Sequence, residues 1–184
     1  FEVCGHKWAD LSEGGYGVSL MNDCKYGYSM KDRVITQTLI KSGTEPNLTA
    51  DQEEHFFTYS LYPHAGTWRE AGTVQEALNL NVPAKAVSSA AEKDRMEFLS
   101  VDKRNVVLET VKKAEDGDGI IVRLYEVENA RTKVTLYCAD AILSAEETNL
   151  LEQPVESAID VKENEISLTI KPYEIRTIRI RTTK

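Results

Sequence analysis

The sequence predicts an all-β fold built from antiparallel sheets, and three observations indicate it. Apolar and polar residues alternate with period two, most clearly at 120–125, 134–138 and 166–170. Such alternation gives a strand one buried and one solvated face, as half-buried antiparallel strands require. Turns containing glycine separate the segments, and stretches of helical period are scarce. Many short strands joined by turns are typical of a β-sandwich.

The N-terminal half adds candidate strands that are rich in β-branched and aromatic residues, at 17–21, 34–40 and 56–62. Two short helices are also expected. Thr73 followed by Glu76 has the spacing of a capping box, and Ser144 followed by Glu147 gives a second, weaker start.

The composition changes at Pro83–Arg95, where the residues are small, polar and without pattern. A boundary in this segment divides the chain into two β units, 1–90 and 91–184. The alternative is a long loop within a single sandwich.

Composition limits the class of protein. The chain has 184 residues with 22 Lys+Arg against 30 Asp+Glu, a formal net charge of −8. This acidity argues against nucleic acid as a partner. No apolar stretch approaches the length of a membrane span, so no membrane partner is expected. The sequence begins at Phe1 without methionine, which suggests a piece of a longer protein.

The cysteines and histidines carry no metal or disulfide pattern. Cys4, Cys24 and Cys138 form neither a C-x-x-C motif nor an even set, which favours buried or incidental free thiols in a reducing, cytoplasmic compartment. His55 and His64 flank a strand-like run, which would place them at opposite ends of that strand and keep them from sharing an ion unless other elements join them. Each of the three histidines, His6 included, is predicted to be structural.

Two sequence features resemble sites without completing them. Asp116 and Asp118 imitate the start of a calcium loop, but Ile120 and Val127 occupy later ligand positions. A hairpin turn is therefore predicted there. Signatures of a serine nucleophile are also missing, so no catalytic residue is predicted in this chain.

The densest polar and aromatic cluster covers 8–13, Tyr16 and 22–28. Aromatic faces can cover the C–H surface of a sugar ring, while carboxylates and an ammonium group bind its hydroxyls. The cluster is thus a candidate carbohydrate site. The alternative from the residues alone is that its aromatic side chains belong to the core or an edge and its charges are solvated.

Several blocks of sequence resemble the C-terminal β region of family 38 glycoside hydrolases, the α-mannosidases, and most of all their cytosolic and bacterial branch. They are FEVCGHKWADLSEGGYGVSLMNDCKYGYSMK, ADQEEHFFTYSLYPHAGTWREA, SVDKRNVVLETVKKAEDGDGIIVRLYEVENAR and ISLTIKPYEIRTIRI. Together they cover nearly the whole chain. The resemblance implies that 1–90 is the C-terminal part of a large, supersandwich-like antiparallel β-sandwich, and that 91–184 is a smaller terminal β-sandwich domain.

For function, the resemblance implies retaining hydrolysis of terminal α-mannosyl linkages in glycans or oligosaccharides. The nucleophilic aspartate and the ligands of a divalent metal, zinc or similar, belong in this family to an upstream α/β domain that the sequence does not contain. The expected partners are this catalytic domain of the same polypeptide and a mannose-containing glycan. Whether the protein also forms a homo-oligomer is left open.

The resemblance makes five residues candidates for the wall of the substrate cleft: Asp23, Lys25, Lys41, Trp8 and Asp10. Lys41 stands where related enzymes often have arginine, so a bidentate grip would be lost. Structural contact with the catalytic domain is the alternative role for each candidate. Asp51 and His55 are equally consistent with a pair that supports the fold.

A second function class stays open, a stand-alone carbohydrate-binding β-sandwich module. If the α-mannosidase interpretation holds, the isolated chain should be inactive. It should also expose an apolar patch through which it could dimerise.

Overall fold

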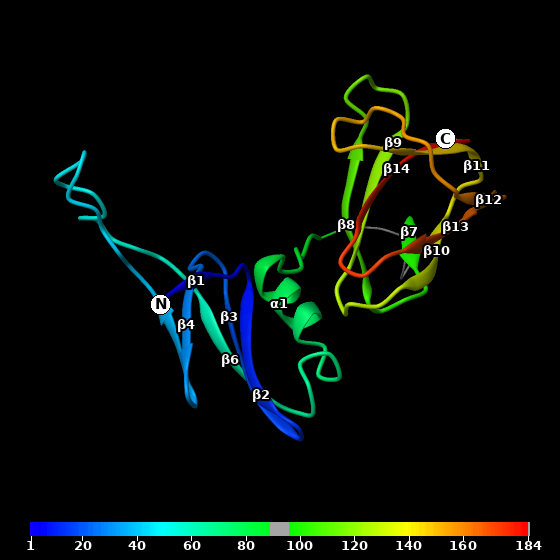
Figure 1. Ribbon diagram of the computed structural model, residues 1–184. Coiled ribbons are helices and arrows are strands. Elements are labelled where there is room, and N and C mark those ends of the chain that lie inside the picture. Colours follow the sequence, from blue (N-terminus) through cyan, green and yellow to red (C-terminus); the bar gives the residue numbers. More distant parts are fainter. Residues whose placement is uncertain (89–95, 184) are drawn as a thin grey trace. The chain divides into compact units, whose positions relative to one another are not determined.

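The computed structural model describes residues 1–88 and 96–183 of the chain (Figure 1). The chain divides into two compact units, unit 1 at Phe1–Ser88 and unit 2 at Ser89–Lys184. Residues 89–95, part of the segment in which the sequence predicts a boundary, lie outside the described residues. All strand pairs in both units are antiparallel and the described part of the chain has one helix, so the predicted all-β fold is confirmed.

Unit 1 contains two three-stranded sheets. The first has the order β1-β4-β5, with β1 at Val3–Cys4, β4 at Gly27–Lys31 and β5 at Val34–Thr38. The second has the order β2-β3-β6, with β2 at Trp8–Glu13, β3 at Tyr16–Asn22 and β6 at Tyr59–Ala65. The predicted strands at 17–21 and 34–40 match β3 and β5, whereas the one at 56–62 begins three residues later than expected.

The helix α1 spans Thr73–Asn81, but the predicted capping box is wrong. Gly72 occupies the N-cap position with φ of 70° and offers no side chain to the helix. The Thr73 hydroxyl instead lies 2.9 Å from the Ser19 hydroxyl in a buried hydrogen bond. The Thr73 hydroxyl, which the local sequence assigns to the N-cap of the helix, is therefore used in a tertiary hydrogen bond.

Unit 2 contains two four-stranded sheets. The first has the order β12-β13-β10-β7, with bounds Asp160–Lys162, Glu165–Ile170, Thr132–Cys138 and Leu99–Val101. The second has the order β11-β14-β9-β8, with bounds Ile142–Thr148, Ile175–Thr182, Ile120–Glu126 and Val106–Lys113. The predicted helix start at Ser144 is wrong, because Ser144 lies in β11 opposite Arg181 of β14.

The core of unit 2 follows the period-two pattern of its strands. Alternate residues of β10 and β13 are buried, and they join residues of β8, β9 and β14 in one cluster: Val106, Val122, Leu124, Val134, Leu136, Ile166, Leu168, Ile170, Ile178 and Ile180. Because side chains alternate between the two faces of a strand, each strand sends every second residue into this layer. The cluster packs the two sheets as a sandwich.

Unit 1 buries far less apolar surface. Its buried hydrophobic residues, within the described part of the chain, are Leu20, Met21, Tyr28 and Ala77. Large apolar side chains are instead exposed on several of its strands and loops, such as Tyr16, Leu61 and Phe56. A unit of this size normally stabilises itself by burying a contiguous core. Unit 1 therefore lacks a contiguous buried core comparable to that of unit 2.

No helix among residues 1–88 and 96–183 is both long and apolar enough to cross a membrane.

Candidate functional site

Asp10 and His64 form a buried pair in unit 1. The Nε2 atom of His64 lies 2.7 Å from Oδ2 of Asp10, and their side chains are 2% and 4% exposed. The same Oδ2 accepts a 2.7 Å hydrogen bond from the Ser19 hydroxyl. Gly17 lies opposite His64 in the β3–β6 register, and a Cβ there would come within 2.5 Å of the imidazole. Residue 17 must therefore be glycine to leave room for the His64 ring.

The sequence leaves two roles open for Asp10, sugar binding and structural contact. Its bonds to His64 and Ser19 are structural contacts. Since the carboxylate accepts, Nε2 of His64 donates the hydrogen bond to Asp10. Nδ1 is buried and has no hydrogen-bond partner in the described residues. His64 is thus held by one side of its ring, in a network that continues through Ser19 to Thr73 of α1.

Trp8, another cleft candidate, packs against an aromatic side chain of the segment before α1. The rings of Trp8 and Trp68 have centroids 5.0 Å apart, and the guanidinium of Arg69 lies 4.1 Å from the Trp68 ring centroid. Trp8 is half-buried in this contact. No local pattern indicated its partner, which lies 60 residues further along the chain.

Asp23 and Lys25 are brought together with residues 56–58 at one corner of unit 1. Asp23 accepts the Thr58 amide at 2.9 Å and donates its own amide to the Thr58 carbonyl at 3.2 Å. The Thr58 N–H lowers the pKa of the Asp23 carboxyl below its usual value. The Lys25 ammonium lies 4.9 Å from the centre of the Phe57 ring. This corner carries an ionised carboxylate, a cation and an aromatic face.

Lys41 lies outside this corner, exposed in the segment that follows β5. In the same segment His55 reaches Asp51, but Nε2 contacts the main-chain carbonyl at 3.0 Å and not the carboxylate. The structure thus brings together Asp23 with Lys25, places Asp10 and Trp8 against α1 and the segment before it, and leaves Lys41 exposed. Sugar contact by these residues stays a prediction.

The described residues contain no group of three or more His, Cys, Asp or Glu side chains able to hold a metal ion. Asp116 and Asp118 lie in the turn between β8 and β9, as the hairpin interpretation of their sequence predicts. Each pairs with an arginine of β14: Asp116 with Arg179 at 2.6 Å and Asp118 with Arg181 at 2.8 Å. Because arginines engage both carboxylates, this turn does not fit a divalent-metal site.

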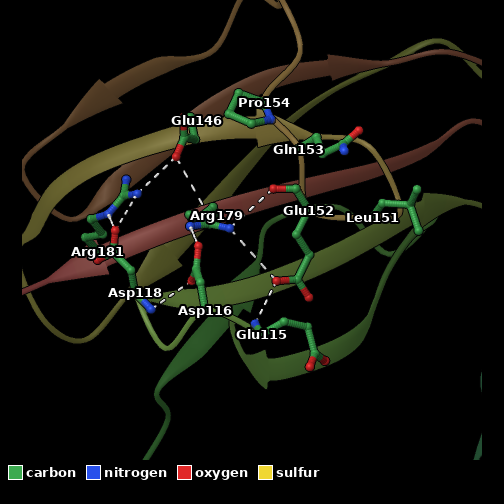
Figure 2. A pocket seen from close by; sticks show the side chains of 10 residues that line it. All are labelled: Glu115, Asp116, Asp118, Glu146, Leu151, Glu152, Gln153, Pro154, Arg179 and Arg181. Carbon is green, nitrogen blue, oxygen red and sulfur yellow. Dashed lines mark hydrogen bonds and ion pairs between the residues drawn. The ribbon is translucent and has the colours of Figure 1, made fainter.

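These pairs border a hollow of about 560 Å³ on unit 2 (Figure 2). Its lining is mostly charged and comprises Glu115, Asp116, Asp118, Glu146, Leu151, Glu152, Gln153, Pro154, Arg179 and Arg181. The Arg179 side chain is only 8% exposed, and it donates to Asp116 and to the Glu152 carbonyl. Figure 2 shows the carboxylates arranged around the two arginines. The charged lining residues pair with one another. We call them the ionic clamp, which joins β14, the β8–β9 turn and the loop after β11.

Because the carboxylates of the ionic clamp must be ionised to pair with its arginines, we expect unit 2 to lose stability at acid pH. The pKa of Asp116 is lowered by the Asp118 amide and Arg179, that of Asp118 by Arg181, and that of Glu152 by Lys112. Groups with a lowered folded-state pKa add stability above their unfolded pKa, and that stability is lost as the pH falls through the folded pKa. Below about pH 4 the urea midpoint of unit 2 should therefore fall.

The control compares two substitutions. Asp116→Asn should reduce this pH-dependent loss, whereas Asp160→Asn, at an exposed pair with Lys162, should leave it unchanged. Urea titrations at neutral and acid pH measure both. If the urea midpoint of the Asp116→Asn variant falls with pH as much as that of the unmodified chain, the clamp does not cause the acid sensitivity of unit 2.

Comparison with known families gives two matches in chain order. The glycosyl hydrolases family 38 C-terminal domain matches residues 1–49, within unit 1. The glycosyl hydrolases family 38 C-terminal beta sandwich domain matches residues 105–178, within unit 2.

Curated relatives agree along the whole chain. Alpha-mannosidase 2C1 of Homo sapiens is 36% identical over 184 residues, and alpha-mannosidase G of Dictyostelium discoideum is 40% identical over 190. Each match includes 97% of this chain but only 18% and 17% of the relative. The chain thus spans less than one fifth of the length of these relatives.

Solved structures share the fold. Two from Enterococcus faecalis, a protein in glycosyl hydrolase family 38 and an alpha-mannosidase, match with TM-scores of 0.76 and 0.77 at 21% identity. The matches cover 98% of this chain and 23% and 21% of those chains. With both family matches in order, the chain belongs to glycosyl hydrolase family 38, of which it forms the C-terminal β region.

Proposed function

We propose that this chain is the C-terminal β region of a retaining α-mannosidase, which hydrolyses terminal α-mannosyl linkages of glycans or oligosaccharides. The observation that carries the proposal is the match over 97% of the chain to relatives that are named α-mannosidases. In the proposed enzyme, unit 1 packs on the catalytic part of the polypeptide and contributes to the wall of its cleft.

The catalytic groups belong elsewhere in this proposal. A retaining glycosidase uses two carboxylates about 5 Å apart, one as nucleophile and one as acid and base. The carboxylates described above are engaged otherwise: Asp10 with His64, Asp23 with Thr58, and Asp116 with Arg179. The nucleophile and the divalent metal would be supplied by the remainder of the enzyme, where such a metal would supply Lewis-acid polarisation of substrate oxygens.

The cleft wall that we propose consists of Asp23, Lys25 and Lys41. The low pKa of Asp23 keeps it ionised and able to accept hydrogen bonds from sugar hydroxyls. Lys25 and Lys41 can donate to them. Burial of Asp10 against His64 and Ser19 favours a role for Asp10 in the fold.

We also propose a cytoplasmic location. Cys4 and Cys24 are free and exposed, and Cys138 is free and buried. Exposed unpaired thiols persist best in a reducing compartment. Two exposed thiols and one buried thiol agree with the buried or incidental free thiols that the sequence predicts.

The test begins with the isolated 184-residue chain, which should not hydrolyse an aryl α-mannoside with or without added zinc. Turnover that disappears when one carboxylate of this chain is replaced would contradict the proposal. Specific binding of mannosides by the inactive chain alone would instead favour the stand-alone carbohydrate-binding module.

In the complete enzyme, Asp23→Ala and Lys41→Ala should each lower kcat/KM by about ten- to a hundredfold, the loss of one charged hydrogen bond to substrate. Asp23→Asn keeps an acceptor for the Thr58 amide and separates loss of charge from loss of the loop contact. Lys31→Ala, on an exposed residue at the end of β4, is the matched control and should leave kcat/KM unchanged. Lower melting temperatures with normal turnover per folded molecule would assign these residues to the fold.

A further inference from the structure

Unit 1 fixes the main chain of Lys25 from two sides. The Lys25 amide donates to Oδ1 of Asn22 at 2.7 Å, and the Lys25 carbonyl accepts from Nε2 of Gln37, in β5, at 2.8 Å. Asn22 is itself fully buried, and its own carbonyl accepts from Nδ2 of Asn81, in α1, at 2.9 Å. A strand, a buried amide side chain and the helix therefore hold the backbone from which the Lys25 side chain extends.

The Lys25 side chain ends at an aromatic ring. Its ammonium lies 4.9 Å from the centroid of Phe57, within the range of a cation–π contact. The Phe57 ring is half-buried and stacks beside that of Tyr59, with centroids 6.4 Å apart and 25° between the planes. A ring face attracts an ammonium without accepting a conventional hydrogen bond, so the three N–H donors of Lys25 stay available to a ligand.

Phe57 is also linked to the carboxylate of this corner, through the next residue of the chain. The Asp23 carboxylate accepts from the Thr58 amide at 2.9 Å, and the Asp23 amide donates to the Thr58 carbonyl at 3.2 Å. Two consecutive residues, Phe57 and Thr58, thus contact the cation and the carboxylate of the proposed cleft wall. A donor and an acceptor held in fixed places suit a sugar, whose hydroxyl groups both donate and accept.

We propose that Phe57 is a positioning residue of the α-mannosidase, whose ring holds the Lys25 ammonium in the place from which it donates to a sugar hydroxyl. Phe57 acts through Lys25 and does not touch the substrate. Without the ring, the long side chain of Lys25 would occupy many rotamers, and substrate binding would have to order it. The inference rests on the proposed function for the ligand, a mannoside, whereas the placement of the ammonium rests on the contacts within unit 1.

The first measurement is a double-mutant cycle on kcat/KM of the complete enzyme with an aryl α-mannoside. Phe57→Leu should lower kcat/KM by about two- to thirtyfold, the range of a cation–π contact. Phe57→Tyr keeps an aromatic face and should retain most of the activity. In a Lys25→Ala background, Phe57→Leu should have no further effect, because the ring then has no ammonium to hold. Phe56→Leu makes the same change at a neighbour that is 83% exposed, and this matched control should leave kcat/KM unchanged.

The second measurement needs no turnover. The complete enzyme and its variants, without substrate, are acylated with a water-soluble N-hydroxysuccinimide ester, and peptide mass spectrometry follows the rate at Lys25. The cation–π contact stabilises the protonated amine, which does not react, so Phe57→Leu should raise this rate by about two- to tenfold and Phe57→Tyr should not. Lys31, at the exposed end of β4, is the internal reference and should react at the same rate in every variant.

The outcomes separate this inference from the proposed function. If Phe57→Leu lowers kcat/KM equally with and without Lys25, or if Phe57→Tyr is as impaired as Phe57→Leu, Phe57 serves packing and the inference is wrong. An unchanged acylation rate at Lys25 in Phe57→Leu would overturn it as well. Normal kcat/KM for Lys25→Ala in an active enzyme would refute the inference and leave the hydrolysis intact. An inactive unmodified enzyme would refute the function, and faster acylation in Phe57→Leu alone would then still support placement of the ammonium by Phe57.

Discussion

Replacing Asp10 with alanine should destabilise unit 1 by about 2 to 4 kcal/mol, because the buried N–H of His64 would lose its acceptor. The Asp10 and His64 side chains are 4% and 2% exposed, so water cannot replace the carboxylate without opening the sheet. Ser19 keeps its bond to Thr73, which limits the loss to the His64 side of the network. Unit 1 has few buried hydrophobic residues to offset such a cost.

The readout for Asp10→Ala is tryptophan fluorescence during urea unfolding, since the chain has two tryptophans and both, Trp8 and Trp68, lie in unit 1. Asp10→Asn should recover part of the stability, because its amide oxygen can still accept from Nε2. Glu13→Ala, on an exposed residue of the same strand, should leave the midpoint unchanged. If the urea midpoint of Asp10→Ala is unchanged and turnover of the complete enzyme is lower, Asp10 binds substrate and does not serve the fold.

Leu136→Ala should destabilise unit 2 by about 2 to 5 kcal/mol through lost burial and the cavity left behind. Leu136 is fully buried in the core cluster and lies in register between Val101 of β7 and Ile166 of β13. The strands on both sides hold the backbone in place, so the surroundings cannot collapse into the space.

Hydrogen exchange of unit 2 peptides measures the loss, while tryptophan fluorescence monitors unit 1. Leu143→Ala removes the same side chain from an exposed position of β11 and should change stability by less than about 0.5 kcal/mol. Similar exchange rates in the Leu136→Ala variant and the unmodified chain would mean that the predicted cavity does not form or costs nothing.

Local pattern was sufficient for most of the secondary structure. The alternation at 134–138 and 166–170 predicts β10 and β13 because the side-chain period of a strand is a property of neighbouring residues. The same logic failed at Thr73 and Ser144, where a spacing typical of helix starts met stronger tertiary demands. Thr73 bonds Ser19, and Ser144 pairs across β11 and β14.

The site residues were less accessible to sequence reasoning. Asp23 and Lys25 were candidates through the family resemblance, but their neighbours Phe57 and Thr58 lie more than 30 residues away. Arg179 of β14 is buried and pairs with Asp116 of the β8–β9 turn, a contact that no local pattern indicated. The residues next to an Asp or Glu in the sequence do not indicate which cation its carboxylate will pair with in the fold.

Consecutive residues were enough to predict the all-β class, most strands and the resemblance to the family 38 C-terminal region, because alternation and extended blocks of similarity are local features of a sequence. Folding brings Asp10 against His64, 54 residues away, and Asp116 against Arg179, 63 residues away, and no local pattern indicated either pair. The fold also places the segment that includes α1 against one particular face of β2-β3-β6. The physical reason is that register and sheet order bring distant residues together, and burial then fixes their charge partners, whereas period two alone says only that a strand has two faces.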